Sequence, residues 1–405
     1  MKITWLDRLA QFHNLLQCEL FPLLESAVGP LDKQSKRLAA VVSLEPLARF
    51  VSARRAHTGR PLSDRLALAT AFFAKAVYSL PTTRHLIQRL QTDTPLRRLC
   101  GWDSAAQVPT EATFSRAFAE FAASALPAKI HEELVRHSQQ GRVIGYIARD
   151  STAIEAREHL PGDKDKAKSV PAPAEVPKPA RKRGAKKGRH KRSQARQRGT
   201  RLQRQQHMTR EQMLAELPRQ CSLGVKKSSK GYRQYWRGYK LHWDVADGGR
   251  IPISCLLTGA SVHDSQVAIP LMRLSAERVS WSCDLMDSAY DAKAIRQESA
   301  KLRHEVLIKP VKRKRKTPTP DIEFSDDQKQ RFKKRTIVEQ LNARLKDEFG
   351  ARIIYVRGAS KIMAHLMFGV VVLTVDQLLR RVIDASSRAS FLYHCGLPSE
   401  RCVCC

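Results

Sequence analysis

Acidic residues are scarce in this chain. Its 405 residues include 39 Asp and Glu against 72 Lys and Arg, a formal net charge of +33. Such a balance indicates a polyanionic partner, most commonly nucleic acid. The excess is not confined to one segment. Residues 161–210 contain 17 Lys and Arg and 3 acids, a net +14, so +19 of the total +33 lies elsewhere.

A long uninterrupted apolar run is also missing. The first residues include Asp7 and Arg8 and show no apolar core of a secretory signal. The most apolar late segment, 366–379, is shorter than a bilayer span and contains Thr374 and Asp376. We therefore expect this segment to be a buried helix. We expect no membrane partner and a cytoplasmic, nucleoid-associated protein if the source is bacterial.

The cysteines are few and scattered. Nine is an odd number for a chain of this length, which argues against a disulfide framework. His394, Cys395, Cys402, Cys404 and Cys405 form one cluster, but their spacing matches no usual zinc site. Reduced thiols without a ligand role are favoured over metal binding there.

Apolar residues recur at three- and four-residue spacing through most of the first 140 positions. The pattern is clear in 6–24, 62–78 and 114–121, and turn signals such as Gly29-Pro30 separate the segments. We predict an all-helical N-terminal domain over residues 1–140. It is either a DNA-binding module or a plain helical bundle that packs on the next domain.

From Val143 the pattern changes to short β-prone runs. The first run, 143–150, ends on Asp150, and further strand candidates lie at 235–245, 251–257, 279–286 and 306–311. Helices are predicted at 265–277 and 290–302. These elements predict an α/β catalytic domain over residues 141–384, a mixed sheet flanked by helices. A C-terminal tail would follow over residues 385–405.

A low-complexity stretch interrupts this domain. Residues 158–225 pass from a proline-rich run to Arg181–Arg192 and then to Arg/Gln repeats. Nothing in this composition provides a core, so we predict a disordered basic insertion. It would bind a phosphate backbone without sequence preference, or serve as a passive linker.

One carboxylate near the C-terminus is framed by an aromatic residue and cations. Phe332, Arg335, Glu339 and Lys346 are offset by 3, 7 and 14 positions, so they share one stripe of a helix. A capping box at Ser325–Gln328 and a stop at Gly350 delimit the predicted helix. The stripe suits a metal ion and a phosphate. The alternative is a solvated amphipathic helix.

Two further acids follow strand candidates. Asp150 ends the first strand, and Asp287 comes after the run 279–286. With Glu339 from the helix, they provide carboxylates able to hold two Mg²⁺ or Mn²⁺ ions about 3.5–4 Å apart. Asp284 is predicted to be an interior residue. His263 and Asp264 are predicted to shape a turn and cap the next helix.

These motifs resemble those of bacterial insertion-sequence transposases with an Asp-Asp-Glu (DDE) triad on a ribonuclease H-like fold. The similarity is to the insertion-sequence-4-like superfamily, whose signature is Tyr-x2-Arg-x3-Glu-x6-Lys. Phe332 here takes the place of the tyrosine, while Arg335, Glu339 and Lys346 keep the spacing. The blocks Asp150-Ser-Thr and Asp287-Ser-Ala-Tyr-Asp are also similar to the family pattern.

The resemblance implies a role for each of these residues. Asp150, Asp287 and Glu339 would ligate two Mg²⁺ or Mn²⁺ ions, and Arg335 and Lys346 would hold DNA phosphates. Phe332 would keep base stacking but lose the tyrosine hydroxyl.

The implied activity is that of a DNA transposase. It would bind the terminal inverted repeats of its element as a homodimer, cut DNA, and join 3′-OH ends to target DNA. Two alternatives stay open: a nuclease of the same fold without strand transfer, and an inactive element-derived nucleic-acid-binding protein.

Overall fold

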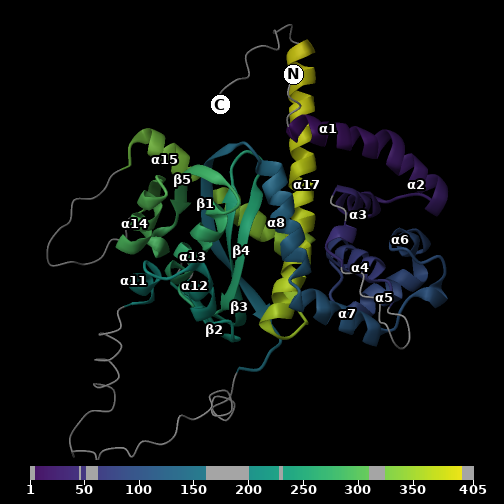
Figure 1. The fold of residues 1–405 in the computed structure, drawn as a ribbon, viewed down its shortest axis with the longest axis horizontal. Coiled ribbons are helices and arrows are strands. Elements are labelled where there is room, and N and C mark those ends of the chain that lie inside the picture. Colours follow the sequence, from purple (N-terminus) through teal and green to yellow (C-terminus); the bar gives the residue numbers. More distant parts are fainter. Residues whose placement is uncertain are drawn as a thin grey trace, which may run out of the picture.

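The computed structural model describes residues 5–44, 47–51, 63–160, 200–227, 231–309 and 324–394. Its first part is helical, as the apolar spacing predicts, and lies on one side of the molecule (Figure 1). The elements are α1 (Trp5–Leu15), η1 (Leu16–Leu20), α2 (Phe21–Val28), α3 (Lys33–Leu44), η2 (Leu47–Arg49), α4 (Arg65–Val77), α5 (Thr83–Thr92), α6 (Thr94–Leu99), η3 (Ala105–Gln107), α7 (Glu111–Ala123) and α8 (Leu126–Gln139). The Asp64 carboxylate caps α4 by accepting from the amide of Leu66 at 2.7 Å.

A seven-stranded mixed sheet forms the second part of the fold. Its strands are β1 (Val143–Ala156), β2 (Ser222–Lys227), β3 (Arg233–Ala246), β4 (Ile251–Gly259), β5 (Ser280–Met286), β6 (Glu305–Ile308) and β7 (Ile353–Ile354). β1 and β4 pair with β3 in antiparallel fashion, whereas β5 pairs with β1, and β6 with β5, in parallel. β2 extends the sheet beside the first half of β3. The predicted mixed α/β sheet with flanking helices is confirmed, and it is consistent with a ribonuclease H-like domain.

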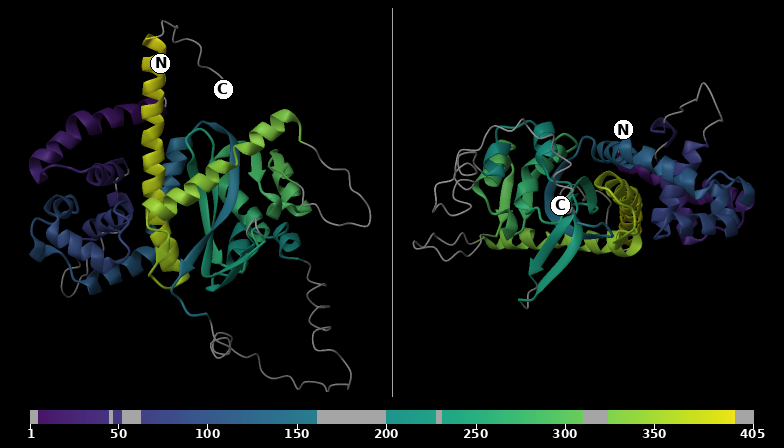
Figure 2. Two further views of the ribbon diagram at one scale, coloured as in Figure 1. Left: turned by 180° about the vertical axis from the view of Figure 1, so that it is seen from behind. Right: turned by 90° about the horizontal axis from the view of Figure 1, so that it is seen from below.

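Helices cover both faces of this sheet (Figures 1 and 2). One side carries α13 (Ser265–Ala276), α14 (Lys293–Lys301), α11 (Arg201–Gln205) and α12 (Arg210–Glu216). The other side carries α8, α16 (Thr336–Glu348) and α17 (Ala359–His394). The helices α13 and α14 agree with the predicted segments 265–277 and 290–302.

The long helix α17 joins the helical part to the sheet. It contacts α1, α3, α4, α7 and α8 as well as β4 and α16. The ring centroid of Phe368 on this helix lies 4.9 Å from that of Phe73 and 5.8 Å from that of Phe72. The segments 1–140 and 141–384 therefore share one hydrophobic core.

The apolar character of α17 is explained by this packing. Residues 359–384 are long and apolar enough to cross a membrane. Their most apolar stretch of 18 residues has a mean hydropathy of 1.9, but 83% of that stretch is buried inside the protein. The predicted buried helix over 366–379 is confirmed. α17 also runs on to His394, so the expected tail over 385–405 begins as helix. Residues 395–405, with four cysteines, lie outside the described residues. The five described cysteines are free thiols.

Three sequence-based boundaries are wrong. First, Asp150 lies in the middle of β1 and does not end it. β5 stops pairing with β1 at Met286, opposite Arg149, whereas β3 continues to pair as far as Glu155. The antiparallel partner therefore extends the strand beyond the point where its parallel neighbour ends.

Second, the expected disordered insertion over 158–225 is too long at its C-terminal side. α11, α12 and β2 lie within or across its last part, and α11 and α12 pack on α13. Thr200 and Thr209 start the two helices with capping boxes. Residues 161–199, the most basic part, lie outside the described residues.

Third, the helix expected between Ser325 and Gly350 is two helices. α15 (Asp326–Lys333) starts with the predicted capping box, and α16 follows after a short break. The amide of Arg335 donates to the carbonyl of Phe332 at 3.1 Å, and that of Val338 to Arg335 at 3.2 Å. This three-residue spacing is the tighter 3₁₀ pattern.

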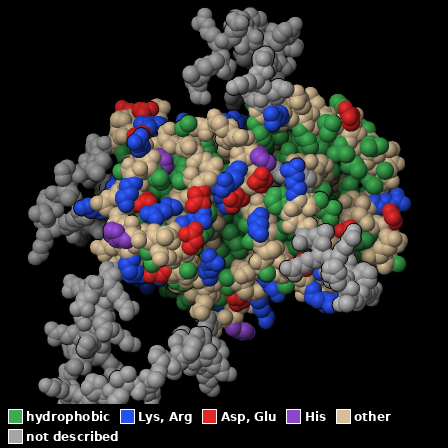
Figure 3. Space-filling view, in the orientation of Figure 1, with side chains coloured by type: hydrophobic (Ala, Val, Ile, Leu, Met, Phe, Trp, Pro, Cys, Tyr) green, Lys and Arg blue, Asp and Glu red, His purple; other side chains and the backbone are tan. Residues whose placement is uncertain are grey.

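Charges of both signs are mixed on the face shown in Figure 3. Lys and Arg side chains lie among Asp and Glu side chains over the α/β part, while hydrophobic side chains gather over the N-terminal helices. The Lys and Arg side chains of the described residues visible on this face are thus interspersed with acids.

Candidate active site

Two aspartates lie side by side where β5 ends against β1. Arg149 on β1 and Met286 on β5 are the last paired residues, and Asp150 and Asp287 follow them. The pairing places both carboxylates on the same face of the sheet, because opposed residues of neighbouring strands share a face. Asp287 also starts a short 3₁₀ turn, η4 (Ser288–Tyr290), by accepting from the amide of Ala289 at 2.9 Å.

The surroundings of this pair disfavour two negative charges. Burial and then the neighbouring charge of Asp287 raise the pKa of Asp150 to about 6, although the amide of Ser151 lowers it. Burial and Asp264 likewise raise the pKa of Asp287. A divalent cation would relieve both the repulsion and the lost hydration, since oxygen ligands are those that Mg²⁺ prefers. The donor set therefore fits such an ion.

Glu339 approaches this pair from α16, which packs on β1. Asn342, one turn further along the helix, donates to the Asp150 carboxylate at 3.5 Å. Glu339 itself binds Arg335 at 2.8 Å, and 54% of its side chain is exposed. In the described ranges, no three His, Cys, Asp or Glu side chains lie close enough to hold one ion. The third carboxylate is thus near the pair but turned toward Arg335.

That ion pair is easily broken. An exposed pair at positions i and i+4 of a helix contributes only about 0.3–0.5 kcal/mol. The Arg335 charge acts on both aspartates and lowers the pKa of each. Little free energy therefore holds Glu339 and Arg335 together.

Lys346 and Phe332 lie apart from the carboxylates. Burial, Lys226 and Arg352 lower the pKa of Lys346, which also interacts with Glu155 near the far end of β1. Glu155 is five residues, or about 17 Å of strand, beyond Asp150. The Phe332 ring packs on Phe324 with centroids 5.4 Å apart, so part of its surface is occupied. The predicted stripe is therefore spread along the helices and does not converge on one point.

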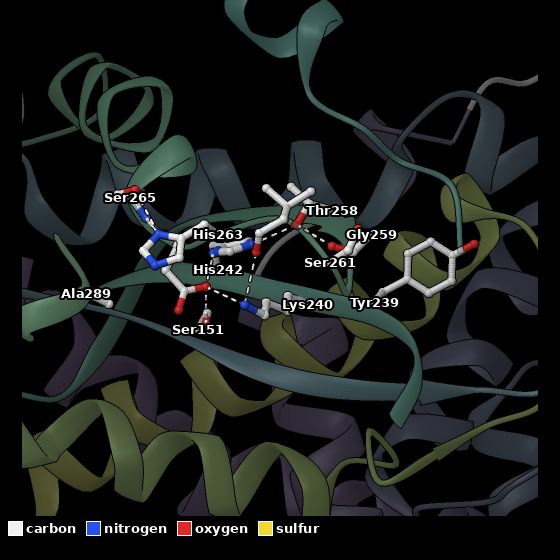
Figure 4. A network of polar contacts seen from close by, with 12 residues as sticks. Ser151, Tyr239, Lys240, His242, Thr258, Gly259, Ser261, His263, Ser265 and Ala289 are labelled. Carbon is white, nitrogen blue, oxygen red and sulfur yellow. Dashed lines mark hydrogen bonds and ion pairs between the residues drawn. The ribbon is translucent and has the colours of Figure 1, made fainter. Parts of the chain in front are cut away.

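Asp264 is a residue whose position the sequence did not reveal. It was expected to cap α13, but its side chain makes no capping bond. Its carboxylate accepts from the Ser151 hydroxyl at 2.9 Å and from the Lys240 ammonium at 3.0 Å. Figure 4 shows Lys240, His242 and Ser151 around this point. In the sequence, Arg237–His242 and Thr258–Ser265 are also similar to the family pattern, and this similarity is the signal that could have indicated the network.

This network is linked to the aspartate pair through Ser151. The Ser151 amide stabilises the Asp150 carboxylate, while its hydroxyl binds Asp264. His242 behind it donates to or accepts from Thr258 at 2.8 Å, and burial lowers its pKa to about 4. The imidazole is thus neutral near pH 7, and Lys240 is the cation that balances Asp264.

Exchange of Asp264 for asparagine should weaken divalent-cation binding to the apo protein. The new amide side chain would keep an oxygen for Ser151 and Lys240 but remove one negative charge near Asp150 and Asp287. A loss of about 1 kcal/mol corresponds to a roughly 3- to 10-fold weaker Kd for Mn²⁺. Calorimetric titration of Mn²⁺ measures it, with Glu277→Gln at the other end of α13 as the control. Equal affinities for Asp264→Asn and wild type would contradict the expectation.

The other acids near this site are structural. Asp284 is fully buried and binds Arg149 and His304, at 3.4 and 3.2 Å. It is therefore an interior residue, as predicted. Asp291 pairs with Arg296 at 3.1 Å.

The fold and the site together define a class of protein domain. A mixed sheet flanked by helices, with paired aspartates at the end of a parallel strand and a glutamate on a facing helix, is typical of ribonuclease H-like phosphoryl-transfer domains.

Comparison with protein families narrows this class. Residues 146–375, more than half of the chain, match the family described as Transposase DDE domain, and residues 24–120 match the one described as Transposase domain (DUF772). The chain therefore belongs to the transposases with a DDE domain. No curated protein and no solved structure matches it.

Proposed function

We propose that this chain is the transposase of a bacterial insertion sequence of the insertion-sequence-4-like group. It binds the terminal inverted repeats of its element, cleaves the DNA and joins the 3′-OH ends to target DNA. The observation that carries this proposal is the pair Asp150 and Asp287, adjacent in register and both with a raised pKa beside α16. Family membership supports the same conclusion.

Asp150, Asp287 and Glu339 are the residues that would hold two Mg²⁺ or Mn²⁺ ions. Bound there, the ions would activate the attacking water or 3′-hydroxyl and stabilise the oxygen that leaves phosphorus. The strands fix the two aspartates, and Glu339 joins them when its side chain leaves Arg335. Arg335 then has its guanidinium available for two parallel hydrogen bonds to a phosphate.

The remaining proposed contacts concern DNA outside the reacting bond. Lys346 would bind a backbone phosphate farther along the substrate, since it lies near Glu155 and not near Asp150. Phe332 would offer at most one edge to a base, because Phe324 covers part of its ring. The helical segment 1–140 and the basic residues 161–199 would add phosphate contacts. A homodimer would be needed to hold two ends at once.

The test is a cleavage and joining assay. Labelled DNA that carries the sequences flanking the coding region is incubated with the protein and Mg²⁺, with supercoiled plasmid as target. Cleaved ends and joined products are expected. Cleavage without joining would indicate a nuclease, and binding without either product would indicate an inactive DNA-binding protein.

The cleavage rate should fall as pH falls through about 6. Because its pKa is raised to about 6, Asp150 is increasingly protonated below that pH and then no longer offers a charged ligand. Protons and metal compete for this carboxylate, so a higher Mg²⁺ concentration should shift the fall to lower pH. Rates between pH 5 and 8 at two Mg²⁺ concentrations measure this. An acidic limb that ignores Mg²⁺ would show that Asp150 is not a metal ligand.

A further inference from the structure

We propose that the hairpin formed by β2 and residues 233–238 of β3 is a DNA-binding surface of this transposase. The inference rests on the proposed function and adds a contact that lies outside the carboxylate site. The hairpin projects from the body of the molecule, as the right view in Figure 2 shows. Such a projection is available to a large partner.

One face of the hairpin combines apolar and cationic side chains. Leu223 lies opposite Arg237 and Val225 opposite Tyr235, and opposed residues of an antiparallel pair share a face. Leu223, Val225 and Tyr235 are exposed by 48%, 53% and 58%. Arg233, two residues before Tyr235, belongs to the same face.

The two arginines are available for a ligand. Arg233 and Arg237 are exposed, and neither has an ion-pair partner among the described residues. Most arginines of the α/β part, by contrast, bind carboxylates, as Arg273 binds Glu298 at 2.6 Å. Arg233 and Arg237 stand four residues apart, about 13 Å along the strand, so they would reach different phosphates.

The opposite face of the hairpin carries Gly224 and Trp236, which are paired across the two strands. The Trp236 ring covers Gly224 so closely that a β-carbon there would lie 2.3 Å from it. The Trp236 indole donates to the carbonyl of Tyr239 at 3.1 Å. The Trp236 ring thus packs across both strands of the hairpin.

Cations connect the hairpin to the active site. Lys226 on β2 lies near Lys346 of α16, which is about 10 Å of helix beyond Glu339. At the base of the hairpin, Arg157 stacks on the Tyr355 ring with 4.4 Å between guanidinium and ring centroid. Basic side chains thus continue from the carboxylates toward the hairpin.

Charge identifies the occupant as DNA. The exposed face offers arginines for phosphates and Tyr235 for a sugar or base, the combination that binds nucleic-acid strands. In a second copy of this chain the same face would carry the same two arginines, so two such faces would repel each other.

Photo-crosslinking from position 235 tests this contact directly. The full chain with p-benzoylphenylalanine in place of Tyr235 is irradiated with duplex DNA carrying the element's ends, in EDTA. A protein–DNA adduct is expected from position 235. None is expected when the same group replaces Val143, which is exposed by 69% and lies at the end of β1 far from the hairpin. A protein–protein adduct from position 235 would overturn the proposal.

Salt dependence of binding gives a second readout. The double variant Arg233→Ala/Arg237→Ala should lower the slope of log K against log salt by about 1.8, because each phosphate contact contributes about 0.9. Lys301→Ala/Arg380→Ala serves as control, since both of these side chains already bind carboxylates. An unchanged slope and no adduct, with wild type still cleaving DNA, would overturn the hairpin as a DNA-binding surface. The proposed transposase activity would stand. Wild type that neither binds nor cleaves DNA would overturn both.

Discussion

Exchange of Asp287 for asparagine is expected to abolish cleavage and joining, with a rate loss of at least about 10³-fold. Asparagine keeps the shape of the side chain and an oxygen for the Ala289 amide, so η4 should still form. The substitution removes one charge from the pair that would hold the metal. The cleavage assay described above measures the loss, with melting of the apo protein as the test of folding.

The matched control is Asp291→Asn, the same chemical change four residues later. Asp291 pairs with Arg296 and would not hold metal, so cleavage should change less than about 3-fold. Burial makes the Asp287 charge unfavourable for the folded state, so Asp287→Asn should melt no lower than wild type. An Asp287→Asn protein that retains a tenth of the wild-type cleavage rate would contradict the proposal that Asp287 holds the metal.

Exchange of Arg149 for methionine should lower the free energy of unfolding by about 3–5 kcal/mol. Arg149 is fully buried and binds Asp244 at 2.8 Å and Asp284 at 3.4 Å. Its loss would leave two buried carboxylates without their cation. Urea unfolding measures this effect.

Two further variants identify the cause of that effect. Lys329→Ala, which removes an exposed pair with Asp326, should cost less than about 1 kcal/mol. The double variant Arg149→Met/Asp244→Asn should be more stable than Arg149→Met alone, because one of the unpaired charges is removed. A double variant that is less stable than Arg149→Met would show that packing, and not charge, dominates at this position.

Local patterns predicted the elements well where burial and periodicity coincide. The strand before Asp287 and the helix after Asp264 agree with their sequence signals because each is short, bounded and apolar on its inner side. The predicted end of β1 was wrong because the residues after Asp150 carry a weaker apolar signal. They are held in the strand by pairing with β3, about 90 positions away. A tertiary partner overrides local propensity in such a case.

For the candidate site, too, some features could be predicted from the sequence and others could not. Asp150, Asp287 and Glu339 could be proposed from motifs, and the register adds that the first two are neighbours. The role of Asp264 could not be derived, because its partners Ser151 and Lys240 lie 113 and 24 positions away. The rotation of Glu339 toward Arg335 depends on side-chain conformation, which the stripe along a helix does not determine.

The late position of α17 in the chain has a consequence for synthesis. Phe72, Phe73 and Phe118 are made early, but their partner Phe368 is synthesised 250 residues after Phe118. Until then the nascent helices expose an apolar surface, which holdase chaperones bind. A premature stop before Ala359 therefore yields a chain without a completed core. Such fragments would be degraded and would not accumulate as competitors for the ends of the element.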